Sequence, residues 1–154
     1  MRYLVYIFIS LLLFTGCDKE VKKGLHEVHW DRDMCERCKM VVSDRKNAGQ
    51  VINPKTGKSY MFDDLGCLVL WFKDENIDWE DQAIIYITDI KTGKFIDARK
   101  AWYDTNSSRT PMDYGFGAHE KKDSSKHYIT YDEARLRILR GETMQNPQIK
   151  KGNL

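Results

Sequence analysis

The chain has 154 residues, a net charge of +2 and an aromatic content of 12%. Its length suits one ordinary domain or two very small ones, and the aromatic share predicts a packed core. The 25 basic and 23 acidic residues are interspersed along the chain. The sequence therefore offers neither the basic patch of a nucleic-acid-binding protein nor an acidic tail.

The N-terminus has the pattern of a bacterial export signal. Arg2 precedes an apolar run that ends at Phe14, which is short for a membrane-spanning helix and typical of a signal peptide. The end of this run and the residues after it, from Leu13 to Cys17, resemble a lipobox. We expect cleavage after residues 1–16, a lipid anchor on Cys17, and a polar linker over residues 17–30.

The first half of the folded part reads as strands around one helix. Strands are predicted at 40–42, 49–52, 59–62 and 83–88, and the continuous apolar character of 83–88 indicates a central position in a sheet. Between the last two strands, Asp63 and Asp64 offer an N-cap carboxylate. The apolar residues that follow at helical spacing predict a buried helix, and they are Leu65, Leu68, Val69 and Phe72.

The second half has weaker signals. A strand is predicted at 95–98, and another at 127–130 leads into a helix capped by Asp132 that runs to Leu139. Residues 104–117 are rich in Gly, Ser, Asn and Pro, so we expect a functional loop there. Residues 142–154 lack an apolar pattern and are expected to be disordered.

An internal repeat suggests how the elements are grouped. Laying 60–68 over 128–136 matches a strand, a capping Asp and a helix in order. We therefore predict an α+β protein of two small similar ββαβ-like modules, the first over 31–90 and the second over 91–141. The Lys-Thr-Gly-Lys segments at 55–58 and 91–94 do not fit this register and are interpreted as recurring turn chemistry.

A sulfur-rich cluster, Cys35, Cys38 and Met40, lies between the linker and the first strands. Thiolates and thioethers favour Cu(I) over metals that prefer oxygen ligands. If Cys38 and Met40 lie on one strand, their side chains point to the same side, which would form a bidentate sulfur clamp. Cys35 is a candidate third ligand.

Other interpretations of this cluster remain open. In an oxidising compartment, Cys35 and Cys38 can form a structural disulfide or the centre of a thiol–disulfide oxidoreductase, although a thioredoxin-like pair opens a helix in a βαβ unit. Met40 can also be a core residue, because two valines follow it. A structural zinc site needs a second Cys or His pair, and the sequence has no such pair.

Further candidates for a ligand lie elsewhere in the chain. Met112 stands in the Gly-rich loop, where a backbone can approach a metal closely. Imidazole also suits copper. His119 and His127 are therefore candidates too, but weaker ones than the sulfur ligands. Cys67 falls in the apolar helix and is interpreted as a small buried hydrophobe. His26 and His29, in the expected linker, are the weakest candidates, and Met61 reads as a core residue.

Together these segments resemble the NosL family of copper-binding accessory lipoproteins of nitrous oxide reductase maturation. The resemblance rests on the lipobox Cys17, the Cys-x-x-Cys-x-Met segment, the Tyr-Met-Phe-Asp-Asp junction from Tyr60, and the Thr-Pro-Met loop. It implies that Cys38 and Met40 bind Cu(I) and that Met112 joins them. Asp113 and Tyr114 depart from the smaller residue that often follows this methionine.

The same resemblance implies a copper carrier, not an enzyme, anchored on the periplasmic side of the cell envelope. Its implied partners are apo nitrous oxide reductase and the ABC-type maturation complex in the membrane. The remaining alternatives are an exported thiol–disulfide oxidoreductase that uses Cys35 and Cys38, and a structural lipoprotein with one disulfide.

Overall fold

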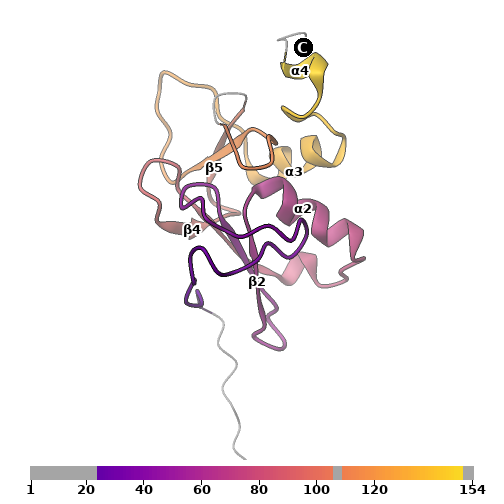
Figure 1. Ribbon diagram of the computed structural model, residues 1–154. Coiled ribbons are helices and arrows are strands. Elements are labelled where there is room, and N and C mark those ends of the chain that lie inside the picture. Colours follow the sequence, from indigo (N-terminus) through magenta and orange to yellow (C-terminus); the bar gives the residue numbers. More distant parts are fainter. Residues whose placement is uncertain (1–23, 106–108, 151–154) are drawn as a thin grey trace, which may run out of the picture.

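The computed structural model describes residues 24–105 and 109–150. The expected signal peptide and Cys17 lie outside these residues. Four strands form one sheet in the order β2-β1-β3-β4, and two more form a second sheet, β5-β6; every pairing between strands is antiparallel. Two helices, α2 and α3, pack against each other beside the sheets (Figure 1). The predicted α+β class is confirmed.

The first sheet follows the predicted strands closely. Its strands are β1 (Gly49–Ile52), β2 (Ser59–Phe62), β3 (Ile84–Thr88) and β4 (Phe95–Asp97). The predicted central position of β3 is confirmed, because it pairs with both β1 and β4. β4 lies beyond the predicted module boundary at residue 90 and yet belongs to this sheet.

Two turns in this sheet share one geometry. Asn53 Oδ1 accepts hydrogen bonds from the N–H groups two and three residues later, and Asp89 Oδ1 does the same in the second turn. Each turn ends with a left-handed glycine, at φ 71° for Gly57 and 70° for Gly93. The recurring Lys-Thr-Gly-Lys segments are therefore turn chemistry, as predicted.

Helix α2 (Leu65–Asp74) begins directly after β2, and the predicted cap is confirmed. Asp64 is its N-cap and accepts a hydrogen bond from Gly66 N–H at 3.1 Å. The helix buries most of its first two turns against the sheet. After it, the short 3₁₀ helix η2 (Glu80–Gln82) leads into β3.

The four-stranded sheet and α2 form a first unit, and the two-stranded sheet and α3 form a second. The second unit departs further from the prediction. β5 (Trp102–Thr105) and β6 (Phe116–His119) were not predicted, and the expected loop over 104–117 includes the end of one and the start of the other. The expected strand at 127–130 is reduced to a single bridge between Tyr103 and Ile129. Helix α3 (Tyr131–Leu139) is capped by Thr130, so the predicted Asp132 cap is wrong by two residues.

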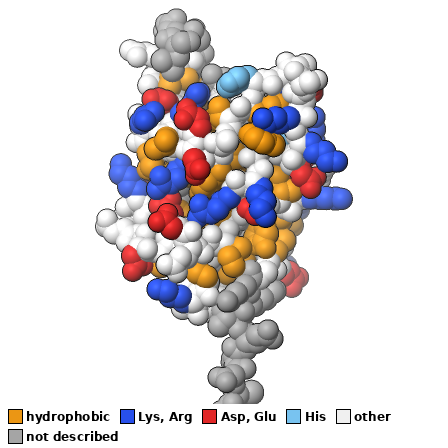
Figure 2. Space-filling view, turned by 180° about the vertical axis from the view of Figure 1, so that it is seen from behind, with side chains coloured by type: hydrophobic (Ala, Val, Ile, Leu, Met, Phe, Trp, Pro, Cys, Tyr) orange, Lys and Arg blue, Asp and Glu red, His pale blue; other side chains and the backbone are white. Residues whose placement is uncertain are grey.

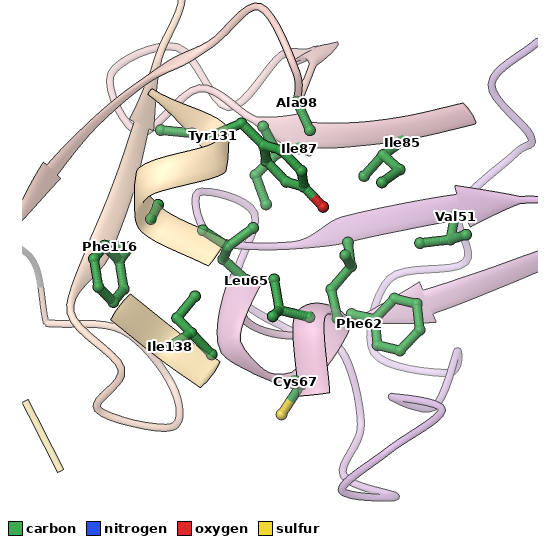
Figure 3. Close-up of a cluster of buried hydrophobic side chains, with 14 of the residues drawn as sticks. Val51, Phe62, Leu65, Cys67, Ile85, Ile87, Ala98, Phe116, Tyr131 and Ile138 are labelled. Atoms are coloured by element: carbon green, nitrogen blue, oxygen red, sulfur yellow. The ribbon is translucent and has the colours of Figure 1, made fainter. Parts of the chain in front are cut away.

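One continuous core joins the two units. Ile90 N–H donates to Ala118 C=O at 2.9 Å, which links the two sheets. Leu65 of α2, Phe116 of β6 and Tyr131 of α3 belong to the same buried cluster (Figure 3). The opposite face from Figure 1 mixes basic and acidic side chains, without an area of one sign (Figure 2).

The ends of the described chain are more ordered than predicted. His26 N–H donates to Gln50 Oε1 at 2.8 Å, and Val28 and Trp30 pack against the core, so the folded part begins within the expected linker. The expected disorder from residue 142 is wrong for residues 142–150, which include the short helix α4 (Pro147–Lys150). In the part of the chain that the structure describes, no helix has the length and apolarity needed to span a membrane.

Candidate metal centre

The Cys-x-x-Cys-x-Met segment forms a tight turn and not a strand. Cys35 N–H donates to Met40 C=O at 2.7 Å, and Lys39 N–H donates to Cys35 C=O at 3.0 Å. Lys39 adopts φ 60°, which closes the turn. The predicted strand at 40–42 is reduced to one bridge between Val41 and Met34, so the shared-strand geometry expected for Cys38 and Met40 is wrong.

The turn is attached to β2 at its first cysteine. Cys35 forms a parallel bridge with Met61, and Glu36 N–H donates to Met61 C=O at 2.8 Å. These contacts bury Cys35 completely. β2 ends one residue beyond Met61, and α2 begins at Leu65, so the thiol of Cys35 is brought to the start of that helix.

Four potential metal ligands meet there. The sulfur atoms of Cys35, Cys38 and Cys67 and a carboxylate oxygen of Asp63 all lie within 4.8 Å of one another. The Cys38 thiol donates to Asp63 Oδ2 at 3.3 Å. Asp63 Oδ1 is buried and has no hydrogen-bond partner among the described residues. We call these four residues the thiol cluster.

Cys67 reaches the cluster because it occupies the first turn of α2. Its side chain is fully buried, as the sequence indicated, but its sulfur points away from the labelled apolar residues around it (Figure 3). Sequence reasoning assigned it to the core and assigned Asp63 only to capping. The signal available for both was the odd number of cysteines after Cys17, one of which follows a pair of aspartates by three residues.

The three thiols have different affinities for protons. A hydrogen bond from the Cys67 thiol lowers the pKa of Cys35 to about 6 against the opposing effect of burial. Burial, with the neighbouring Cys35 and Asp63, raises the pKa of Cys38 to about 12. The hydrogen bond to Cys35 and burial also raise the pKa of Cys67. Of the three thiols, the surroundings therefore favour the deprotonated form of Cys35 and the protonated forms of Cys38 and Cys67.

The loop between β5 and β6 that carries Met112, called the Met112 loop below, is fixed to the N-terminal end of α2. Met112 N–H donates to Asp64 Oδ2 at 3.1 Å, and Met112 C=O accepts from Gln145 Nε2 at 2.7 Å. Tyr114 lies against Gly66, where an added Cβ would be only 2.0–2.3 Å from the tyrosine ring. The C-terminal segment therefore holds this loop beside the residues that flank the thiol cluster.

The predicted ligands are distributed unevenly around the cluster. Cys35 and Cys38 lie in it, Met40 is next to Cys35 through the backbone but 45% exposed, and Met112 is partly buried. Among the described residues, no histidine takes part in the cluster. His119 is buried in β6, where its Nε2 lies 2.8 Å from Asp104 Oδ2.

The remaining histidines and Met61 lie outside the cluster. His127 is exposed. His26 and His29 line a pocket together with Met34 and Met61. The side chain of Met61 is directed to Gln50, whose amide lies 3.3 Å from the methionine sulfur, so Met61 is a structural residue as predicted.

Fold and site together define a small α+β protein with a buried, thiol-rich candidate metal centre. The family model NosL matches residues 28–140, and the chain belongs to the NosL family. The fold also matches the crystal structure of the copper chaperone NosL from Shewanella denitrificans, with a TM-score of 0.55 and 19% identity over 73% of this chain and 96% of that one. Among curated proteins, no match was found.

Proposed function

We propose that this protein is a Cu(I) carrier and not a catalyst. The observation that carries the proposal is the convergence of three thiols, two of them buried and that of Cys38 partly buried, at one point. Soft sulfur ligands prefer Cu(I) to ions that bind oxygen. The similarity of the fold to a protein described as a copper chaperone supports the same conclusion.

The ligand set combines the sequence prediction with the geometry of the cluster. We assign the ion to Cys35, Cys38 and Cys67, with Met40 and Met112 as thioether ligands at the edge of the site. Cu(I) binds few ligands at a time, so these five sulfur atoms exceed what it needs. The excess suits a carrier, because ligands can be exchanged without releasing the ion.

Met40 is well placed to take part in the transfer. It is 45% exposed while Cys35, beside it in the backbone, is fully buried. An incoming donor on a partner would therefore meet the ion first on the Met40 side, bind it, and displace the thiols in turn. The family resemblance suggests apo nitrous oxide reductase and its ABC-type maturation complex as partners, with the protein tethered to the envelope through a lipid on Cys17.

The proposal is tested by anaerobic Cu(I) titration against a strong competing chelator, under reducing conditions. Each of Cys35→Ser, Cys38→Ser and Cys67→Ser should weaken binding by more than about tenfold, equivalent to about 1.4 kcal/mol, with Cys38→Ser the most affected. Met40→Leu and Met112→Leu should weaken it less. Met34→Leu is a matched control, because Met34 lies in the same turn region and is 49% exposed.

The titration also separates the alternatives. Parent-like Cu(I) affinity in every cysteine variant would contradict the ligand assignment. A carboxylate beside three thiols also suits Zn²⁺, so a parent that prefers Zn²⁺ under the same conditions would contradict the copper assignment. A redox-active disulfide between Cys35 and Cys38, with disulfide reductase activity and no Cu(I) binding after reduction, would favour the oxidoreductase.

A further inference from the structure

Arg37 stands between the two cysteines of the turn, but its side chain does not join the thiol cluster. Its Nε donates to Asp74 Oδ2 at 2.8 Å, and its Nη1 donates to Tyr114 Oη at 3.0 Å. Asp74 is the last residue of α2, and Tyr114 follows Met112 by two residues. One guanidinium thus connects the cysteine turn, the helix that carries Cys67, and the Met112 loop.

The position of the tyrosine hydroxyl is fixed by packing. Tyr114 is 4% exposed, and its ring lies so close to Gly66 that no other side chain fits at that position. Met144 N–H also donates to Tyr114 C=O at 3.2 Å. The hydroxyl is therefore a rigid acceptor for Arg37, and a planar guanidinium can hold two acceptors at once in a defined geometry.

The two cysteines of the turn depend on this connection to different degrees. Cys35 is held by β2 through its bridge to Met61. Cys38 is only partly buried and directly follows Arg37, so the anchoring of Arg37 fixes the part of the turn that carries it. The Met112 loop is attached to α2 by Asp64, and Arg37 is the side chain that ties the cysteine turn to that loop through Tyr114.

We propose that Arg37 and Tyr114 are positioning residues that hold the Cys38 side of the turn against the Met112 loop, so that the Met112 thioether reaches an ion bound by the thiols. This inference rests on the proposed Cu(I) function and adds to it. Neither residue touches the metal. Each acts by keeping the thiol and thioether ligands, which come from separate segments of the chain, at one fixed separation.

The test compares Tyr114→Phe and Arg37→Gln with the parent in the same Cu(I) competition. Tyr114→Phe keeps the ring on Gly66 and removes the hydroxyl, which accepts from Arg37 and is also hydrogen-bonded to the Gln145 side chain. Loss of a supporting contact around a metal ligand typically weakens affinity by about 10–100-fold, and we expect a decrease near the lower end. Arg37→Lys should bind Cu(I) as weakly as Arg37→Gln does. A lysine keeps the positive charge, but it lacks the planar guanidinium that can donate to two acceptors in a fixed geometry.

Two readouts distinguish positioning from a general structural effect. X-ray absorption should count one sulfur fewer around Cu(I) in Tyr114→Phe, as it should in Met112→Leu. In an Arg37→Gln background, Met112→Leu should cause no additional loss of affinity, because residues that act through one another are not additive. Arg137→Gln, which breaks a similar pair with Glu133 on α3, is the matched control and should bind as the parent does.

The possible outcomes distinguish the positioning role of Arg37 and Tyr114 from the Cu(I) carrier function. If the parent binds Cu(I) tightly and Tyr114→Phe and Arg37→Gln bind it equally well, the positioning role is wrong while the carrier function stands. Additive losses in the double variant, or a Met112→Leu variant with unchanged affinity, would also overturn it. A parent that fails to bind Cu(I) would overturn the carrier function itself.

Discussion

Helices α2 and α3 begin with the same device and lead to different results. Each follows an extended segment, and each is capped by a side-chain oxygen: Asp64 accepts from Gly66 N–H at 3.1 Å, and Thr130 accepts from Glu133 N–H at 3.4 Å. Three residues after the cap, α2 carries Cys67, whereas α3 carries Glu133. The first belongs to the thiol cluster, and the second pairs with a neighbouring arginine.

The difference comes from what covers each helix start. The cysteine turn and the Met112 loop close over the start of α2, so Asp63 and Asp64 are 2% and 0% exposed. The start of α3 has no such cover, and Thr130 and Asp132 are exposed. Burial raises the pKa of the cap Asp64, and Asp63 Oδ1 is buried without a hydrogen-bond partner among the described residues. The thiol cluster at the start of α2 therefore depends on the segments that pack over this helix end, and not on the cap itself.

The largest loss of stability should come from filling the space at Gly66 into which the Tyr114 ring packs. Gly66→Ala would place a Cβ 2.0–2.3 Å from the Tyr114 ring, and overpacking of this kind typically costs about 1–3 kcal/mol. We expect a loss of about 3 kcal/mol in the free energy of unfolding, measured by urea denaturation. Gly24→Ala is the control, since a Cβ there meets no atom within 4 Å; equal stability of the two variants would refute the close packing.

Removing the buried cap should have the next largest effect. Asp64→Ala leaves the N–H groups of Gly66 and Met112 without their acceptor. An unsatisfied buried donor costs about 1–3 kcal/mol, so we expect a loss of about 2 kcal/mol in the free energy of unfolding. Hydrogen exchange should show faster exchange of the Met112 amide. Unchanged exchange there would mean that Asp64 does not hold the loop.

The same carboxyl should make stability depend on pH. Burial raises the pKa of Asp64 to about 6, against the backbone donors that favour its charged form. A carboxyl whose pKa is raised by folding stabilises the folded state fully below its unfolded pKa of about 3.9, and that contribution is lost as the pH rises through about 6. The difference in stability between the parent and Asp64→Ala should therefore change between about pH 4 and 6. A constant difference would contradict the burial of this charge.

The exposed cap of α3 should matter less. Thr130→Ala removes one long hydrogen bond from a solvent-exposed helix end, and loss of an N-cap typically costs about 1 kcal/mol. Urea denaturation should show a decrease of this size or smaller, with Cu(I) affinity unchanged. A decrease as large as that of Asp64→Ala would remove the distinction between the two helix starts.

The smallest effect should come from the surface pair on α3. Arg137 Nε lies 2.8 Å from Glu133 Oε1, four residues earlier on the helix. Such pairs contribute about 0.2–0.5 kcal/mol, so Arg137→Gln should lower the free energy of unfolding by no more than this amount. The effect should also shrink as salt is added; a larger loss that is insensitive to salt would indicate a role beyond this pair.

The sequence was sufficient for most of the first unit, and in the second it was sufficient for helix α3, which ends at Leu139 as predicted, but not for the strands. β1, β2, α2 and β3 were predicted within a residue or two at each end, because their apolar residues follow clear periods and their turns contain Asn, Gly and Pro. β5 and β6 were missed because each has only four residues and β6 contains Gly117, which has low strand propensity. Their pairing is non-local, and no local pattern reports it.

The candidate site was predicted from composition and not from geometry. Cys35 and Cys38 stand out as soft ligands in any reading of the sequence. Cys67 joins them only because the turn packs along β2, with Cys35 beside Met61, and that register cannot be derived from local sequence. The order of residues 142–150 was missed for a related reason, since Gln145 and Met144 are held by contacts to the distant Met112 loop.

Lys39, between the second cysteine and the methionine, has a backbone conformation that most side chains avoid, at φ 60°. Glycine adopts this conformation at little cost, so Lys39→Gly should leave the ligands on either side undisturbed. A β-branched residue would resist it. In searches for similar centres in uncharacterised genomes, tolerance for glycine or asparagine at this middle position should therefore be a better criterion than the presence of a basic residue.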